Sequence, residues 1–119
     1  MKSLTIWKYP LQTMVRSQTI EVPAGARVLH ADIQSGAVTV WALVDPDEAL
    51  RERIEVWVMG TGHPFAESFA GSVPVAQDLH VCTVMDDPFV WHVFARTLRT
   101  IGVDMGKGES VGVEVPTGA

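Results

Sequence analysis

The most distinctive short motif in the sequence is Gly60-Thr61-Gly62-His63-Pro64, which places an imidazole directly after two closely spaced glycines. Glycine tolerates positive φ angles and proline fixes its own φ, so the motif is typical of a tight turn, with His63 bonding back to the main chain. It does not form a phosphate cradle, because it lacks the lysine and the following helix of a P-loop. The alternative interpretation is a loop that contacts a ligand or partner.

A zinc site is the second chemistry that the residue types allow, since zinc accepts imidazole and thiolate ligands. The four candidates are His63, His80, Cys82 and His92. In a strand, the spacing His80-x-Cys82 places both groups on one face. No paired C-x-x-C or H-x-x-x-H motif accompanies them, so the spacing favours core packing or ordinary polar contacts, and we expect neither a metal nor another cofactor.

Acid–base catalysis would need carboxylates, and two groups of them stand beside prolines. They are Asp45, Asp47 and Glu48 in the first group and Asp86 and Asp87 in the second. Carboxylates at such positions typically cap backbone N–H groups in turns. Cys82 lies in an apolar stretch, and no serine stands in a nucleophile-elbow sequence. We therefore predict that the protein is not an enzyme.

The charge pattern disfavours nucleic acid as a partner. The formal net charge is −5, from 9 basic and 14 acidic side chains, and the basic residues are scattered. Neutralising several phosphates requires a local stripe of lysine and arginine. The nearest approach to one is Arg51, Arg53, Arg96 and Arg99, which are better read as solvated surface charges.

Length and composition predict one folded domain. The chain has 119 residues, of which 47% are hydrophobic and 19% charged, so a buried core is expected and general disorder is not. With one cysteine, no intrachain disulfide can form. The N-terminus lacks the features of a signal peptide, and no window approaches the roughly 20 apolar residues of a membrane span. We expect a protein of the cell interior with no membrane partner.

Hydrophobic residues alternate with period two along most of the chain, which predicts strands with one buried face. The clearest hairpin joins residues 27–34 to 37–44 through Ser35-Gly36. One helical turn is possible over 47–53. The other strands are expected over residues 4–9, 19–22, 54–59, 68–75 and 79–84.

Residues 88–101 are ambiguous between helix and strand. Asp87, Pro88 and Gly102 suit the ends of a helix. Residues 90–94 are rich in β-branched and aromatic side chains, as in a buried strand. We favour a strand through about Ala95.

The C-terminal segment alternates again, with Val111, Val113 and Val115 at every second position. Such an arm either closes the protein's own sheet or adds a strand to a neighbouring subunit through main-chain hydrogen bonds. We expect a β domain over residues 1–95 and a C-terminal extension over 96–119. The valines and the loop at residues 60–64 are the predicted contact sites for a partner or ligand.

The four tryptophans, Trp7, Trp41, Trp57 and Trp91, all fall within expected strands. In such positions we expect tryptophan to pack in the core or on the surface of a barrel. Tryptophan also dominates protein–protein hot spots, so one on an exposed face would mark a docking patch.

Several motifs occur in a fixed order, beginning with Trp7-Lys8-Tyr9-Pro10-Leu11 and followed by Pro23-Ala24-Gly25-Ala26. They continue with Trp41-Ala42-Leu43-Val44-Asp45-Pro46, the loop at residues 60–64, and Val90-Trp91-His92-Val93-Phe94. Over about residues 6–94 the chain resembles a family of small uncharacterised proteins encoded largely by bacteriophages and prophages. No catalytic role is established for that family, so the resemblance implies no activity and no functional residue.

Together these observations predict a mainly β protein, a small antiparallel barrel or sandwich of six to eight strands with a C-terminal arm. We expect a non-catalytic, phage-associated interaction protein that forms homo-oligomers, such as a virion or assembly accessory, located in the host cytoplasm or the virion. The alternatives are a host-directed inhibitor or anti-defence protein, and a small-ligand or metal-binding module around His63, His80, Cys82 and His92.

Overall fold

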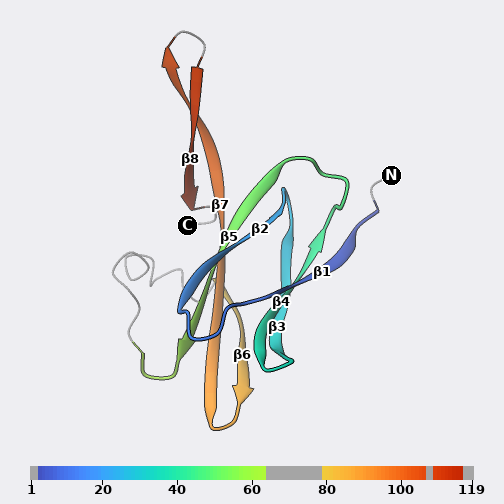
Figure 1. Ribbon diagram of the computed structural model, residues 1–119, viewed down its shortest axis with the longest axis vertical. Coiled ribbons are helices and arrows are strands. Elements are labelled where there is room, and N and C mark those ends of the chain that lie inside the picture. Colours follow the sequence, from blue (N-terminus) through green and yellow to red (C-terminus); the bar gives the residue numbers. More distant parts are fainter. Residues whose placement is uncertain (1–2, 64–78, 107–108, 117–119) are drawn as a thin grey trace.

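The computed structural model describes residues 3–63, 79–106 and 109–116, with side chains described as far as Leu98. Eight antiparallel strands build this part of the chain, and they form two sheets (Figure 1). The expected mainly β class is therefore confirmed. The strands are β1 (Thr5–Pro10), β2 (Ser17–Pro23), β3 (Arg27–Gln34), β4 (Ala37–Val44), β5 (Arg51–Gly60), β6 (His80–Asp86), β7 (Phe89–Gly106) and β8 (Glu109–Pro116).

The smaller sheet has the strand order β1-β4-β3 and contains the predicted hairpin. β3 and β4 pair from Gln34↔Ala37 onward, leaving Ser35 and Gly36 as a two-residue turn with φ angles of 52° and 80°. Two positive φ angles are what a type I′ turn requires, and its twist matches that of the flanking strands. The turn chemistry therefore sets the register of this hairpin.

The larger sheet has the order β2-β5-β7-β6, with β8 also paired to β7. Leu98 of β7 pairs with Arg53 of β5 and with Pro116 of β8. A strand residue has one neighbour on each side, so β8 lies on the side of β7 away from β5, which is also the side of β6. β7 is thus long enough to pair first with β6 and then with β8 along one edge.

The core lies between the two sheets, where alternate residues of the strands meet. Within the described residues, no strand pairing joins the sheets into a closed barrel, so the arrangement is a sandwich. Val40, Val56 and Val93, from three different strands, are fully buried. The cluster comprises Leu11, Ile20, Val22, Ala31, Val40, Ile54, Val56, Val84 and Val93.

The helical turn considered for residues 47–53 does not form. Asp45 Oδ1 accepts the Asp47 N–H at 3.0 Å, and Asp45 O accepts the Glu48 N–H at 3.1 Å, which closes a single turn. Arg51 already pairs with Pro23 as the first residue of β5. The expected strand at residues 68–75 lies outside the described residues.

The ambiguous segment after Asp87 is a strand, and the helical alternative is wrong. Its residues Trp91 to Phe94 pair with β5 on one side and β6 on the other. The backbone hydrogen-bonding groups of this segment therefore find partners along both edges. β-branched and aromatic side chains suit such a doubly paired position. The strand continues beyond the expected end at Ala95 as far as Gly106.

The C-terminal half of β7 and all of β8 form a hairpin that projects from the sandwich (Figure 1). The hairpin lies at the end of the molecule opposite the β6–β7 turn and contributes to a longest dimension of 56 Å. No helix in the described part of the chain is long and apolar enough to cross a membrane.

Candidate functional site

The loop after β5 forms the expected turn, and His63 bonds back to the main chain as predicted. The His63 N–H donates to Gly60 O at 3.0 Å, and the Gly60 N–H donates to His63 Nδ1 at 3.2 Å. Gly62 has a φ of +88°, in the region that favours glycine. Because Nδ1 accepts a hydrogen bond, the neutral ring carries its proton on Nε2. Pro64 lies outside the described residues.

Gly60 is required for a different reason from Gly62. A β-carbon at Gly60 would lie 2.8 Å from two atoms of the His63 ring, so only glycine lets the ring pack over the turn. The sequence Gly60-x-Gly62-His63 thus encodes one fixed placement of an imidazole at the end of β5.

Two further histidines form a hydrogen-bonded chain on the outer face of the larger sheet. His92 Nε2 lies 2.7 Å from Thr61 Oγ1, and its Nδ1 lies 3.1 Å from Thr83 Oγ1. His80 Nε2 lies 3.2 Å from the same Thr83 hydroxyl. Both nitrogens of His92 are therefore engaged by hydroxyl groups, which fixes the orientation of its ring.

Cys82 points away from this chain, so the expectation that His80 and Cys82 share one face of a strand is wrong. The register of β6 against β7 shifts between His80 and Cys82, which marks a bulge at Val81. A bulge adds one residue and reverses the side-chain alternation beyond it. Val81 and Cys82 pack against the core, and Cys82 Sγ contacts Ala31 O at 3.0 Å.

The four candidate zinc ligands do not come together. His80 and His92 are joined only through Thr83, and His63 lies in the turn after β5. Burial raises the pKa of the Cys82 thiol, which disfavours the thiolate that binds zinc. Among the residues that the structure describes, no group of three histidines, cysteines or carboxylates is placed to hold a metal.

Three of the five candidate catalytic carboxylates, those of Asp45, Glu48 and Asp86, accept hydrogen bonds from nearby groups of the chain. Asp45 and Glu48 accept backbone N–H groups within the turn between β4 and β5, as the sequence predicts. Asp86 Oδ2 accepts the indole N–H of Trp91 at 3.2 Å. On the outer face of the larger sheet, the Arg96 guanidinium makes two contacts of 3.0 Å with Glu55 Oε1, so Arg96 is not part of a free basic patch.

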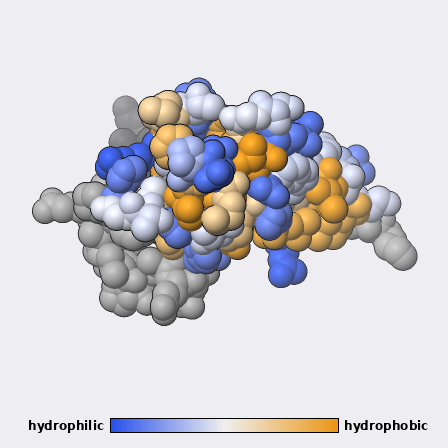
Figure 2. Space-filling view, turned by 90° about the horizontal axis from the view of Figure 1, so that it is seen from below, coloured by the Kyte–Doolittle hydropathy of each residue, from blue (hydrophilic) through white to orange (hydrophobic). Residues whose placement is uncertain are grey.

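A groove of about 400 Å³ opens at the end of the sandwich that holds the β6–β7 turn. Apolar side chains from several strands and loops line it, with Arg16, His63 and Asp86 among its polar residues. Figure 2 views the molecule from this end and shows hydrophobic residues reaching the surface between polar ones. The apolar lining includes Leu11, Ile33, Val38, Val58, Phe89 and Trp91.

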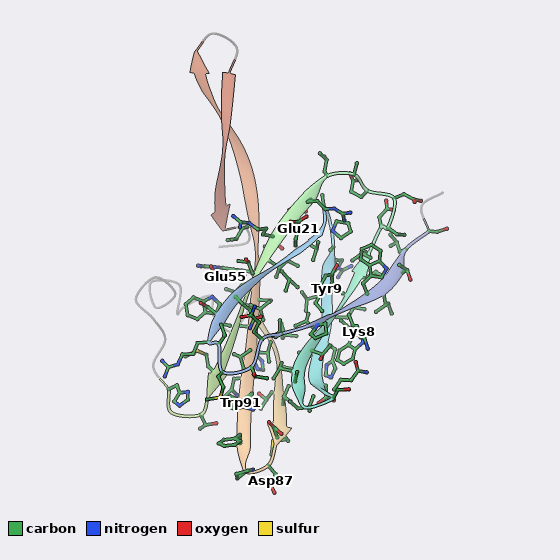
Figure 3. The ribbon with its side chains drawn as sticks, viewed as in Figure 1. Lys8, Tyr9, Glu21, Glu55, Asp87 and Trp91 are labelled. Carbon is green, nitrogen blue, oxygen red and sulfur yellow. The ribbon has the colours of Figure 1, made fainter. Side chains whose placement is uncertain are left out.

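Trp91 and Phe89 form an aromatic ledge on one wall of the groove. Their ring centroids are 5.5 Å apart at an interplanar angle of 25°, which is a stacked arrangement. Figure 3 shows Trp91 beside the turn that holds Asp87. Phe89 stays 56% exposed, so much of its ring is open to solvent.

The segment between β1 and β2 forms the opposite wall and is tied down at both ends. The Leu11 N–H donates to Val38 O at 2.9 Å, and the Val58 N–H donates to Arg16 O at 2.7 Å. Gln12 and Gln18 exchange two hydrogen bonds, of 2.9 and 3.2 Å, that close the base of the segment. Its tip is Met14, which has a φ of 62° and is 97% exposed.

Val111, Val113 and Val115 occupy β8, where they pair with Val103, Ile101 and Arg99 of β7 in the same chain. The predicted contact sites therefore fall in two separate places. His63 lines the groove, and the valines lie in the projecting hairpin. Sequence reasoning missed the segment over residues 12–16 and Phe89, since neither carries a motif, and they meet only in the folded chain.

Comparison with known families matches the model of the Domain of unknown function (DUF7352) to residues 2–101, which is most of the chain. The chain belongs to the DUF7352 family. The groove lies within the matched part of this DUF7352 protein, and the match ends inside β7 at Ile101. A search of curated proteins and a search of solved structures each found no match.

Proposed function

We propose that this DUF7352 protein is a non-catalytic protein–protein interaction module that self-associates through the β7–β8 hairpin. The observation that carries the proposal is the projecting hairpin itself. Within the described residues, β7 beyond Leu98 pairs only with β8, and β8 pairs only with β7. A two-stranded hairpin is marginally stable alone in water, and its unpaired edge is a template for another strand.

The pattern of residues along the hairpin supports a partner. Directly paired residues lie on the same face of an antiparallel ladder. One face thus holds the apolar pairs Ile101↔Val113 and Val103↔Val111, together with Arg99↔Val115 at the base of the hairpin, so its positions are mainly apolar. The alternate pairs are Thr100↔Glu114 and Asp104↔Ser110, so the other face carries polar positions. A hairpin with one mainly apolar face is the pattern of a sheet that is covered on one side.

A second copy of the chain is the partner that this geometry fits best. One edge of β8 is used by β7, so strand addition takes place at the other edge. Antiparallel pairing of two β8 strands joins two hairpins into one continuous sheet about a two-fold axis, a self-complementary contact. The resemblance to phage-encoded proteins supports a role as a virion or assembly accessory in the virion or the host cytoplasm. A host-directed inhibitor is the alternative.

The mass of the full-length protein in solution tests the proposal. We expect a dimer or larger symmetric oligomer by light scattering coupled to gel filtration. Val113→Lys puts a charge on an edge strand, a change that blocks edge-to-edge pairing. The variant should associate more weakly, with a dissociation constant at least about tenfold higher than that of the wild type.

Leu50→Lys is the matched control, because Leu50 is 70% exposed in the turn before β5 and lies outside the hairpin. It should leave the mass unchanged. A wild-type monomer at high micromolar concentration would contradict self-association. A stoichiometric host protein recovered with this monomer would instead favour the inhibitor.

A further inference from the structure

We infer that the groove between the 11–16 segment and the β6–β7 turn is a binding site for a small, uncharged aromatic molecule. The inference is independent of self-association, because the groove and the hairpin lie at opposite ends of the molecule (Figure 1). It rests on the size of the groove, its preformed walls, its exposed ring and its balance of charge.

The groove has the dimensions and lining of a small-molecule site. Its volume of about 400 Å³ lies within the range of such pockets, which are mostly apolar and contain a few polar groups. Leu11, Ile33 and Val38 supply apolar surface, while Gln12 and Thr13 supply polar groups. A large apolar surface with few polar groups favours a ligand that is mainly hydrophobic.

Hydrogen bonds within the chain hold the wall formed by the 11–16 segment in place. The hydrogen bonds of Leu11, Gln12 and Arg16 fix both ends of the 11–16 segment. Met14 at its tip has a left-handed φ of 62°, which is uncommon outside glycine, asparagine and aspartate. Strained backbone of this kind clusters at ligand sites, where the surrounding structure maintains it. The segment thus holds the exposed Met14 thioether at the rim of the groove.

The aromatic ledge points to a planar ligand. Phe89 stacks on Trp91, and Trp91 is held by its hydrogen bond to Asp86. Because Phe89 is 56% exposed, a further ring can stack against it. Aromatic pairs are stabilised by about 0.5–1.5 kcal/mol beyond the burial of their area. Met14, across the groove, adds a sulfur that packs well against ring edges.

The charges on the groove favour an uncharged ligand. Asp86 carries a carboxylate on the β6–β7 side, and Arg16 carries a guanidinium at the end of the 11–16 segment. The two charges are opposite, so an anion attracted by Arg16 is repelled by Asp86, a cation attracted by Asp86 is repelled by Arg16, and this pair gives neither kind of ion a net advantage. A neutral ring avoids both costs and leaves the Asp86–Trp91 hydrogen bond intact.

Methionine methyl NMR of the full-length protein with phenol as the probe tests the site. Met14 lines the groove, whereas the buried Met59 and the exposed Met85 lie outside it and serve as internal references. Phenol should shift the Met14 signal saturably, with an affinity on the order of 1 mM. Cyclohexanol has the same size and a hydroxyl but no aromatic ring, so it should shift the signal far less.

The contribution of the ring is tested by Phe89→Leu, which keeps an apolar side chain but removes the stacking surface. It should weaken phenol binding about three- to tenfold, with an unchanged Met59 signal reporting an intact fold. Trp7→Leu removes an aromatic residue, 37% exposed on β1, and should not affect binding. Equal binding of phenol and cyclohexanol would overturn the inference. So would a Met14 shift that never saturates, or one that Phe89→Leu leaves unchanged.

Discussion

Gly60 shows at the scale of one residue how the absence of a β-carbon allows the His63 ring to pack over the turn at the groove. Gly60→Ala should lower the free energy of unfolding by about 1–2 kcal/mol, because the new methyl group would lie 2.8 Å from the His63 ring and displace it. Urea denaturation measures the change. The same substitution should also move the NMR signals of residues that line the groove near His63.

The clash can be separated from the intrinsic effect of losing glycine. In a His63→Ala background, Gly60→Ala should lower the free energy of unfolding much less, because the ring atoms that the new methyl group would contact are absent. Gly62→Ala should be costly in both backgrounds, because its φ of +88° is unfavourable for alanine whatever the neighbours. Equal costs of Gly60→Ala in both backgrounds would show that the ring contact does not matter.

Two partly buried ionisable groups predict how stability changes with pH. Desolvation raises the pKa of Cys82 above 9.0, opposed in part by its hydrogen bond to Ala31, and also raises that of Tyr9 above 10.0, opposed in part by Arg51. The folded state therefore holds these protons more tightly than the unfolded state. The stability that they contribute is present below the ordinary pKa values and is lost as the pH rises through the raised ones.

The free energy of unfolding should thus fall between about pH 8 and pH 11. Cys82→Ala should remove the part of the decline that begins near pH 9 and Tyr9→Phe the part that begins near pH 10. Urea midpoints measured across this range check the direction. A stability that rises with pH in the wild type but not in the variants would contradict the assignment.

At the scale of strands, the cross-strand pair Glu55↔Arg96 ties β5 to β7 on the outer face of the sheet. The two side chains are only 20% and 10% exposed, and Glu55 Oε1 also accepts the indole N–H of Trp57. Arg96→Met should lower the free energy of unfolding by about 2 kcal/mol, because it leaves the largely buried Glu55 carboxylate without its cation. Urea denaturation measures this change. The double change Glu55→Gln/Arg96→Met should recover part of the loss. If it recovers none, the ion pair is not what stabilises this contact.

Period-two patterning was enough to predict the positions of seven of the eight strands in the described part of the chain and the β3–β4 hairpin, because alternating residues are typical of strands and the turn residues are diagnostic. The faces of β6 were not predictable, since a bulge at Val81 depends on pairing with β7. The extent of β7 was missed because β-branched residues continue past Ala95 into a hairpin whose partner strand follows Gly106. The groove was missed because its walls are distant in sequence.

At the scale of the whole molecule, the two proposed surfaces occupy opposite ends of the sandwich (Figure 1). The groove is formed by the β1–β2 segment and the turns of the sandwich, whereas the hairpin extends β7 past its last contact with β5 at Leu98. The described core residues lie between Leu11 and Val93, and the groove is lined by residues between Leu11 and Trp91, so the groove and this core are built from the part of the chain before the hairpin. Association and ligand binding should therefore be separable by substitution.

A chain that ends at Ile101 tests this separation. It removes β8 and the outer half of the hairpin but keeps all of β1–β6, so we expect it to fold, with cooperative thermal unfolding close to that of the full-length protein. It should be monomeric and should bind phenol as tightly as the intact chain. A truncated chain that fails to fold would mean that the hairpin stabilises the sandwich, and then the oligomeric state of Val113→Lys becomes the decisive measurement, because that variant retains every strand.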